Sequence, residues 1–316
     1  MSPTLPPYIE FGARETAPAP FECKGGHFLG LVLEGEAQKI DALCQQMLNV
    51  PAAGKVEYAP LGHYVVMVVG PFGELRSKAK GFGPMGFVKE TQLSLWLPLA
   101  AGSSVSGTFV PDRFVMACPY VWVDNPMSLL NGREEYGYAK ALGRFDPPNG
   151  LADNVTLSAF GGNFGTNNEA AWHELLKIEK VASAGVPIPI PVGSAQAIAG
   201  AIAQALATVL GDNASAIEIV GEFVESLLQA KVRQVALKQF RDAPKSKNAC
   251  YQAVVEVPVQ LANVSPQLLL SQWQVNLKTL QSYPIGYELG ISTQTTLLSF
   301  EFEADMLLKA GVVVAP

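Results

Sequence analysis

The sequence has few charged residues and no excess of basic ones. Charged residues make up 16% of its 316 residues, and the formal net charge is −6. Nucleic-acid binding depends largely on clustered lysine and arginine side chains that neutralise phosphates, so this composition excludes nucleic acid as a partner. Because hydrophobic residues reach 49%, the chain is also too apolar for general disorder and can bury a substantial core.

Metal-ligating residue types are scarce and scattered. The four cysteines form no CxxC pair, and the three histidines lie equally far apart; they are Cys23, Cys44, Cys118, Cys250, His27, His63 and His173. Metal sites usually show clustered cysteines and histidines, so we expect no metal and no cofactor. Separated cysteines in a chain of this length are typical of buried, reduced thiols in a cytoplasmic protein.

The sequence also lacks a signal peptide and a long hydrophobic run. The N-terminal stretch "MSPTLPPYIEFGARETAPAP" has prolines and acidic residues where a signal peptide needs a basic start and an apolar core. The nearest candidate for a membrane span, residues 195–210, is mostly alanine and falls short of the roughly 20 residues that a bilayer requires. We therefore expect a soluble protein with no membrane partner.

Apolar and β-branched runs predict strands along most of the chain. "HYVVMVVGP" (63–71) is β-branched and ends at Gly-Pro, which marks a strand and its stop. Further strands are predicted at 89–99, 112–123, 153–161, 233–240, 250–263, 271–280 and 294–303. Because few helices separate these runs and no βαβ rhythm is present, we expect a β-rich α+β fold with an antiparallel sheet or barrel.

Two segments depart from the strand pattern. Residues 1–22 contain five prolines before Phe21 and are predicted to form an extended arm. Within 182–232, "GVPIPIPVG" excludes helix, and the alanine-rich, amphipathic stretch that follows favours it. We interpret 182–232 as a helical insertion, which packs against another subunit or covers the mouth of a pocket.

One lysine lies in an unusually apolar stretch, "GREEYGYAKALG" (132–143). Lys140 has only small, aromatic and aliphatic neighbours in "GYAKAL". Just upstream, Asn125 or the aspartate before it can cap a helix, and Pro126 suits the first helical position. If that helix continues to Lys140, Gly143 is a potential C-cap, and the cation would simply stabilise the last carbonyls.

The segment "DNPMSLLNGREEYGYAKALG" (124–143) resembles the central signature of the acetoacetate decarboxylase superfamily, in which a "DN-E/P…GRE…(F/Y)PKK" segment delivers a Schiff-base lysine. "GFVKETQLSLWLPL" resembles the segment that carries a catalytic glutamate in that family. "LKQFRDAPKSKNACYQAVVE" resembles a later strand pair, and the strand near Phe21 to Leu33 also fits. The resemblance covers most of the chain outside 182–232, and the Gly-Arg-Glu to Lys block is its specific part.

The resemblance implies a single domain over residues 1–316, built as an antiparallel cone-shaped barrel around an apolar pocket. It also implies a homo-oligomer that acts on a small-molecule keto substrate. By position, Lys140 would form the imine and Glu90 would serve as acid and base in the proton transfers. A solvent-facing role for Glu90 beside Lys89 stays open.

The chemistry of imine formation requires a dry environment for the lysine. A free lysine has a pKa near 10.4, so about one in a few thousand is the neutral nucleophile at pH 7. Burial in an apolar pocket lowers a lysine pKa by up to about 3–5 units. The small and aromatic neighbours of Lys140 are the residue types that such burial needs.

The remaining candidates for substrate contact are weaker. Arg133 and Glu134 are better explained as structural residues that fix the helix against the barrel. Tyr138 precedes the lysine, and His63 stands near the position of a second family glutamate. The candidate substrate-binding residues are therefore His63, Tyr138, Arg133 and Glu134.

The chain departs from the family pattern at several positions. Ala141 replaces a second lysine, Ala139 replaces a proline, and an arginine of the first strand is missing, with Lys24 the nearest cation. A β-keto carboxylate then has no obvious partner, which argues against decarboxylation of acetoacetate itself. The sequence supports an imine-forming lyase, either decarboxylase-like or an aldolase–dehydratase, with a non-catalytic ligand-binding protein as the competing class.

Overall fold

The computed structural model describes residues 6–10, 12, 14–183, 187–189 and 232–315. The strands are β1 (Phe21–Glu34), β2 (Glu57–Pro60), β3 (Tyr64–Ser77), β4 (Val88–Val105), β5 (Thr108–Val123), β6 (Lys140–Asp146), β7 (Asn154–Gly161), β8 (Ala171–Ser183), β9 (Ile188–Pro189), β10 (Val232–Arg241), β11 (Ala249–Leu269), β12 (Ser271–Leu277), β13 (Gln294–Thr295), β14 (Leu298–Leu308) and β15 (Val312–Ala315). The helices are α1 (Ala37–Cys44), α2 (Val50–Ala52), α3 (Pro126–Asn131) and α6 (Ile285–Glu288), with π-helical turns η1 (Gln45–Asn49) and η3 (Gly132–Tyr136) and a 3₁₀ turn η2 (Gly83–Met85). The predicted β-rich α+β class is confirmed.

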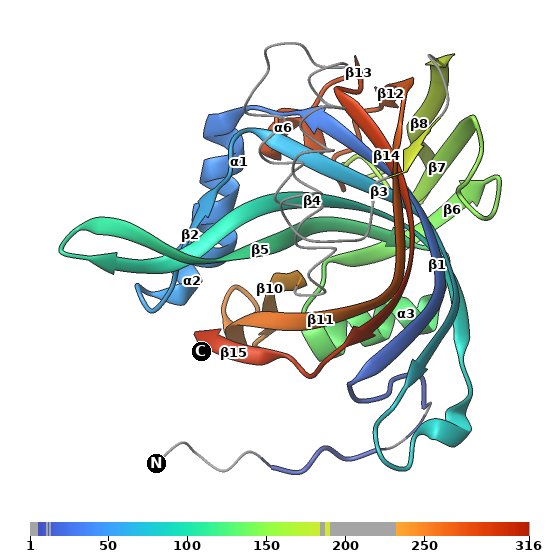
Figure 1. Ribbon diagram of the computed structural model, residues 1–316. Coiled ribbons are helices and arrows are strands. Elements are labelled where there is room, and N and C mark those ends of the chain that lie inside the picture. The colour runs from blue at the N-terminus through green and yellow to red at the C-terminus, as the bar shows by residue number, and fades with distance from the viewer. Residues whose placement is uncertain (1–5, 11, 13, 184–186, 190–231, 316) are drawn as a thin grey trace.

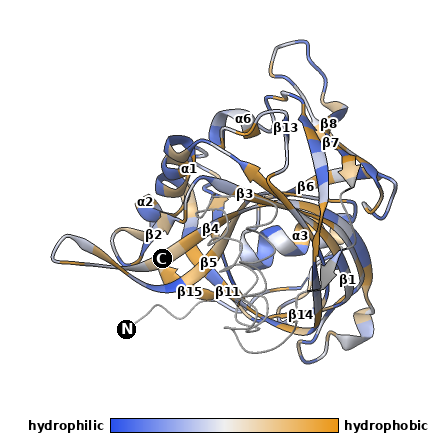
Figure 2. Ribbon diagram, turned by 45° about the horizontal axis from the view of Figure 1, so that its top comes forward, coloured by the Kyte–Doolittle hydropathy of each residue, from blue (hydrophilic) through white to orange (hydrophobic). Residues whose placement is uncertain are grey.

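Seven strands pair in a closed circuit. The sheet runs β5–β10–β11–β14–β1–β3–β4, and β4 also pairs with β5, which joins the two ends of that path (Figures 1 and 2). From β5 the sheet continues outward through β6, β7, β8, β12 and β13 (Figure 1). We call this closed circuit the ring. It has an inner face, on which side chains from all seven strands meet.

The sheet is antiparallel except at two places on β5. β10 runs parallel to β5, with Gln234 opposite Met116, and β6 runs parallel to β5, with Lys140 opposite Val121. Parallel neighbours need a crossover connection, and between β5 and β6 that connection is α3 with η3. This crossover brings the lysine segment back beside the strand it has just left.

The apolar core forms two main clusters. The larger one packs between the outer strands, α1 and the ring, around Leu95, Trp122, Leu157 and Leu176. The second faces the inside of the ring and is rich in aromatic residues; it includes Phe28, Phe72, Phe300 and Phe302. Each fully buried large side chain contributes about 1.5–3 kcal/mol to folding, so the ring and the outer strands stabilise each other.

A strand that sequence patterns did not reveal is β8. Its pairing with β7 contains a bulge, because Leu157 lies opposite Leu176 while the next residue, Ser158, lies opposite Glu174. The bulge buries Leu175 and Leu176 in succession. That burial breaks the strict alternation by which a strand is recognised in a sequence.

The N-terminal arm lies against α3 and η3. The backbone N–H of Ala17 donates to Asn131 Oδ1 at 2.7 Å, and that of Ala19 donates to Glu135 Oε1 at 3.1 Å. The hydroxyl of Ser77 donates to the carbonyl of Pro18 at 2.6 Å. Since β1 begins at Phe21, the predicted arm ends two residues earlier than expected.

Most of the predicted helical insertion at 182–232 lies outside the described residues, as does the apolar run at 195–210. Within the part of the chain that the structure describes, no helix is long and apolar enough to cross a membrane.

The cysteine prediction is confirmed at three positions and wrong at the fourth. Cys23, Cys44 and Cys118 are buried free thiols, whereas Cys250 is exposed. Cys250 lies at the start of β11, beside the turn that follows β10, where its side chain faces solvent.

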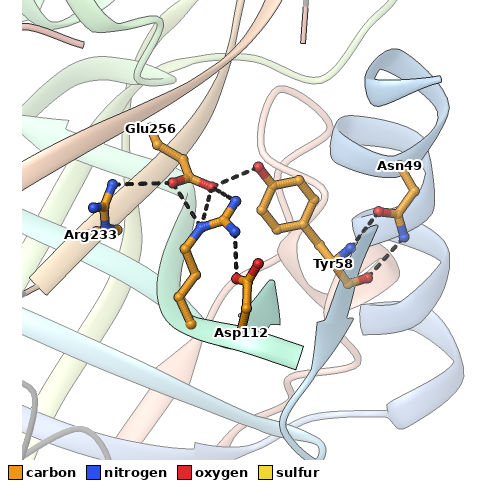
Figure 3. A network of polar contacts seen from close by, with 6 residues as sticks. Asn49, Tyr58, Asp112, Arg233 and Glu256 are labelled. Atoms are coloured by element: carbon orange, nitrogen blue, oxygen red, sulfur yellow. Dashed lines mark hydrogen bonds and ion pairs between the residues drawn. The ribbon is translucent and has the colours of Figure 1, made fainter. Parts of the chain in front are cut away.

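A buried carboxylate joins four strands on the side of the ring near α1. Glu256 of β11 accepts hydrogen bonds from Arg113 of β5, at 2.6 to 3.1 Å, and from the hydroxyl of Tyr58 of β2, at 3.0 Å. Arg233 of β10 lies 3.6 Å away (Figure 3). Glu256 is 1% exposed, so this network fixes the strands around a fully paired charge.

Candidate functional site

Lys140 begins a strand rather than ending a helix. The π-helical turn η3 stops at Gly137, whose φ of +83° is the left-handed conformation that terminates helices and favours glycine. After two more residues the chain enters β6 at Lys140, whose backbone N–H donates to the carbonyl of Tyr138 at 2.8 Å. The alternative that Lys140 caps the end of a helix is therefore wrong.

Glu90 is fixed on β4 by the residues that start α3. The amide of Asn125 donates to the carbonyl of Lys89 at 3.0 Å, and the backbone N–H of Thr91 donates to Asp124 Oδ1 at 2.8 Å. Asn125 also caps α3, since its Oδ1 accepts the backbone N–H of Ser128 at 3.2 Å. The "DN" pair thus fastens the beginning of the helix to the strand on both sides of Glu90.

Lys140, Glu90 and Ser128 form one buried cluster. Lys140 Nζ lies 3.2 Å from Glu90 Oε2 and 2.7 Å from Ser128 Oγ, and the Ser128 hydroxyl donates to Glu90 Oε2. The exposed fractions are 8% for Lys140, 3% for Glu90 and 4% for Ser128. The solvent-facing alternative for Glu90 is therefore wrong. The attraction within a buried ion pair offsets the cost of desolvation only where further hydrogen bonds satisfy its lone pairs and protons. Ser128 adds such a hydrogen bond to each partner.

Gly132 makes room for the lysine side chain. A Cβ atom at Gly132 would lie 2.6 Å from Lys140 Cδ and 2.8 Å from its Cε. Real side chains do not approach so closely, so any larger residue would displace the stem of the lysine. The glycine of the "GRE" motif is thus explained by contact with Lys140.

The amine of Lys140 borders the cavity inside the ring. This main cavity holds about 880 Å³ of empty space, its opening included, and Glu90, Tyr138 and Lys140 lie in its wall. Most of the lining is apolar, and its larger members are Phe28, Phe72, Trp96, Met116 and Phe302. A largely apolar cavity with a few converging polar groups is the usual form of a small-molecule site.

Two glutamines add neutral polar groups to the cavity wall. Gln234 of β10 accepts a hydrogen bond from the hydroxyl of Tyr138, and Gln92 of β4 also lines the cavity. Among the described lining residues, Glu90 and Lys140 alone carry charges. The main cavity is thus suited to an uncharged group.

The groups around Lys140 titrate as expected for dry surroundings. Burial raises the pKa of Cys23 and of Cys118 well above the ordinary value of a thiol. Burial also raises the pKa of the Tyr138 hydroxyl. All three groups stay neutral at physiological pH, so they add no charge next to the lysine and the glutamate.

The other predicted site residues lie in different surroundings. Tyr138 lies in the cavity wall. Arg133 donates from Nη1 to the backbone carbonyl of Lys140 at 2.9 Å, and Glu134 accepts a hydrogen bond from Tyr8. His63 lies 3.2 Å from Glu34 and does not line the cavity.

The structure thus brings Tyr138, Glu90 and Lys140 together. Arg133 is left as a support of the lysine backbone, and Glu134 and His63 lie elsewhere. In the described part of the chain, no three histidine, cysteine or acidic side chains gather in a potential metal site.

Ser128 and Gln234 were missed by sequence reasoning. Ser128 stands in "NPMSLL" as an ordinary residue of the first helical turn, and nothing in the sequence points to its contact with Glu90. Gln234 lies almost one hundred residues from its partner Tyr138. No local pattern links them, because only the parallel pairing of β10 with β5 brings them together.

No protein-family model matches the sequence, and a search of curated proteins finds no match. Solved structures do match. Acetoacetate decarboxylase from Legionella pneumophila is 12% identical at a TM-score of 0.55, over 99% of this chain and 93% of that one. An acetoacetate decarboxylase-like enzyme from Sphingomonas wittichii is 13% identical at 0.55, over 98% of both chains.

A third similar structure is that of the enduracididine biosynthesis enzyme MppR, complexed with the condensation product of pyruvate and imidazole 4-carboxaldehyde. It is 11% identical at a TM-score of 0.51, over 95% of this chain and 91% of that one. At these identities the likeness establishes the fold and not the activity. The chain therefore has the fold of acetoacetate decarboxylase and acetoacetate decarboxylase-like enzymes.

Proposed function

We propose that this protein is a carbon–carbon lyase that binds a carbonyl compound as an imine on Lys140. The observation that carries the proposal is the buried cluster of Lys140, Glu90 and Ser128 at the wall of a largely apolar cavity. An amine, a carboxylate and a hydroxyl within hydrogen-bond reach provide a nucleophile and the groups that move its protons.

In the first step, Glu90 takes a proton from the Lys140 ammonium, and the freed amine attacks the carbonyl carbon. The oxygen of the carbinolamine then takes up protons and leaves as water, with Glu90 returning the proton. Ser128 keeps the amine and the carboxylate side by side during these transfers, because its oxygen accepts a hydrogen bond from the Lys140 amine and its hydroxyl donates one to the Glu90 carboxylate.

In the second step, a carbon–carbon bond breaks between the carbon next to the imine carbon and its substituent. The protonated imine accepts the electron pair of that bond, which leaves an enamine on Lys140. Glu90 takes up a proton from solvent and passes it to the enamine carbon. Water then hydrolyses the new imine, which releases the product and restores the lysine. If the enamine instead attacks an aldehyde, a carbon–carbon bond forms by the same chemistry.

Trapping with borohydride tests the proposal. The protein is incubated with acetoacetate, pyruvate or 4-phenyl-2-butanone and reduced, and the adduct is located by peptide mass. We expect the adduct on Lys140, its loss in Lys140→Arg, and its retention in the matched variant Lys89→Arg, which changes an exposed lysine next to Glu90. Failure of every carbonyl compound to label Lys140 would refute the proposal.

Product analysis separates the two lyase reactions. Carbon dioxide release from an oxo acid identifies a decarboxylase. A condensation product from pyruvate and an aldehyde identifies an aldolase–dehydratase. A labelled Lys140 with neither product leaves a carbonyl-binding protein without turnover.

A further inference from the structure

A second cavity borders Lys140 on the side of the N-terminal arm. It holds about 680 Å³ of empty space, and Ala17 of the arm, Arg76 of β3 and Asn131 of α3 lie in its wall. Five residues line both cavities: Cys23, Leu75, Tyr138, Lys140 and Leu308. The lysine therefore stands where two compartments meet, the main cavity inside the ring and this one, which we call the arm cavity.

The two compartments differ in charge. In the main cavity, the described residues that carry charge are Glu90 and Lys140, which neutralise each other. The arm cavity adds Arg76 and Glu15, and Glu15 is an exposed residue of the arm. An anionic group thus finds its cation in the arm cavity, while the main cavity suits an apolar one.

Arg76 has hydrogen-bonding capacity that the fold does not use. Its Nη2 pairs with Glu74, and its guanidinium lies over the ring of Phe87 at 5.3 Å. Its Nε–H is buried and has no hydrogen-bond acceptor among the described residues. A buried, unpaired donor is unfavourable by itself, so a group bound in the adjoining cavity would be favoured if it supplied the acceptor. The Arg76 side chain as a whole is 34% exposed and lies in the wall of that cavity.

The chemistry of that group follows from the guanidinium. Arginine is always charged and its planar donors match a carboxylate. Sequence reasoning found no arginine for a substrate carboxylate on the first strand. Arg76 is on the neighbouring strand β3, where its backbone lies opposite Glu22 of β1.

We propose that Arg76 binds the carboxylate of an oxo acid whose carbonyl carbon reacts with Lys140 and whose large apolar substituent occupies the main cavity. This inference rests on the proposed imine chemistry and assigns its substrate class. Aromatic lining residues such as Phe72, Trp96 and Phe302 bury the substituent. A short oxo acid leaves the main cavity largely empty and binds weakly.

Three probes separate the two compartments. Pyruvate carries the carboxylate without the apolar group, 4-phenyl-2-butanone carries the apolar group without the carboxylate, and 2-oxo-4-phenylbutanoate carries both. The measurement is the concentration of each probe that half-saturates borohydride labelling of Lys140. We expect 2-oxo-4-phenylbutanoate to label at concentrations about ten- to a hundredfold lower than either of the others.

Two variants separate a substrate contact from a structural ion pair. Arg76→Gln is expected to weaken labelling by the two acids about tenfold or more and to leave 4-phenyl-2-butanone unchanged, and Arg76→Lys restores part of the loss. Glu74→Gln frees Arg76 from its competing carboxylate and is expected to strengthen labelling by the acids. A purely structural Arg76–Glu74 pair predicts instead that both substitutions weaken labelling by all three probes.

The outcomes distinguish this inference from the function on which it rests. If no probe labels Lys140, the imine chemistry itself fails. If all three label Lys140 at similar concentrations, or if Arg76→Gln affects the ketone and the acids alike, the imine chemistry stands and the role of Arg76 is refuted.

Discussion

Two carboxylates are buried beside cationic side chains in this protein, and they differ in what the cation can do. Glu256 is surrounded by Arg113, Arg233 and the hydroxyl of Tyr58 (Figure 3). Glu90 is paired with Lys140 and with the hydroxyl of Ser128. Both glutamates are at most 3% exposed, so burial alone does not separate them.

The difference lies in the proton and in the space around it. Arginine does not give up its proton at any ordinary pH, whereas a lysine can become neutral and then act as a nucleophile. Glu256 lines neither of the two cavities at Lys140, while Glu90 lies in the wall of the main cavity. Similar residues thus hold a permanent cation at Glu256 and, at Glu90, a lysine amine that borders a cavity.

The largest effect is expected from Glu90→Gln. Without the carboxylate, no side chain returns a proton to the oxygen that leaves the carbinolamine, so the rate of borohydride-trapped labelling should fall by about 10²- to 10⁴-fold. The rate is followed by intact mass over time. Glu256→Gln should leave that rate near the parent value, and equal losses in both variants would erase the distinction between the two glutamates.

The free energy of unfolding should be more sensitive to Glu256→Gln than to Glu90→Gln, the reverse of the order expected for labelling. Glu256→Gln leaves Arg113 and Arg233 charged without their partner and is expected to lower the free energy of unfolding by about 3 kcal/mol. In Glu90→Gln the loss should be smaller, because Lys140 can release its proton and stay buried as a neutral amine. Urea unfolding of both variants measures this, and a larger loss in Glu90→Gln would contradict it.

Gly132→Ala sharpens the comparison at the lysine alone. The added Cβ meets the stem of Lys140, which should lower stability by about 1–3 kcal/mol. It should also slow labelling about tenfold, because the amine is displaced from Glu90. Gly83→Ala is the matched control, since nothing lies within 4 Å of a Cβ there. Unchanged labelling in Gly132→Ala would show that the stem has room to move.

The smallest effect concerns alkaline stability. Burial raises the pKa of Cys23 and Cys118, next to Lys140, and of Tyr58, beside Glu256. In the unfolded chain thiols lose their protons near pH 8.5 and tyrosines near pH 10. The unfolded state therefore releases these protons first, and stability falls as pH rises, by up to about 1.4 kcal/mol per unit for each thiol.

Variants measure the share of this decline that comes from the two thiols and from Tyr58, since burial raises the pKa of Cys44 and Tyr138 as well. Cys23→Ala/Cys118→Ala should flatten the decline between about pH 9 and 10, and Tyr58→Phe should flatten it only above about pH 10. Unfolding free energies at a series of pH values measure both. A decline of the same slope in all three proteins would show that other groups cause it.

The sequence predicted the strands better than the connections. Runs such as 63–71 and 112–123 are rich in β-branched and aromatic residues, and they fall on the observed strands β3 and β5. The predicted stop at Gly70-Pro71 is wrong, because both residues pair with β4 and β3 continues to Ser77. The bulge in β8 hid that strand, and the parallel entry of β6 beside β5 depends on the crossover through α3. Neither feature leaves a local periodic pattern.

At the site, the sequence pointed to residues and not to their environment. Lys140 and Glu90 were selected from a family resemblance, and they lie in one cluster. His63 lies just before β3, next to Glu34, and does not line the cavity. Ser128 and Gln234 were missed, since their contacts with Lys140 and Tyr138 depend on which strands and turns meet at the site.

The most direct test of the central claim is exchange of the carbonyl oxygen. Formation and hydrolysis of an imine replace the oxygen of a ketone with one from water, with no reductant and no further reaction required. With 2-oxo-4-phenylbutanoate labelled with ¹⁸O at the ketone, we predict rapid loss of label with the parent protein and loss at the uncatalysed rate with Lys140→Ala. Equal rates in the two proteins would show that Lys140 forms no imine.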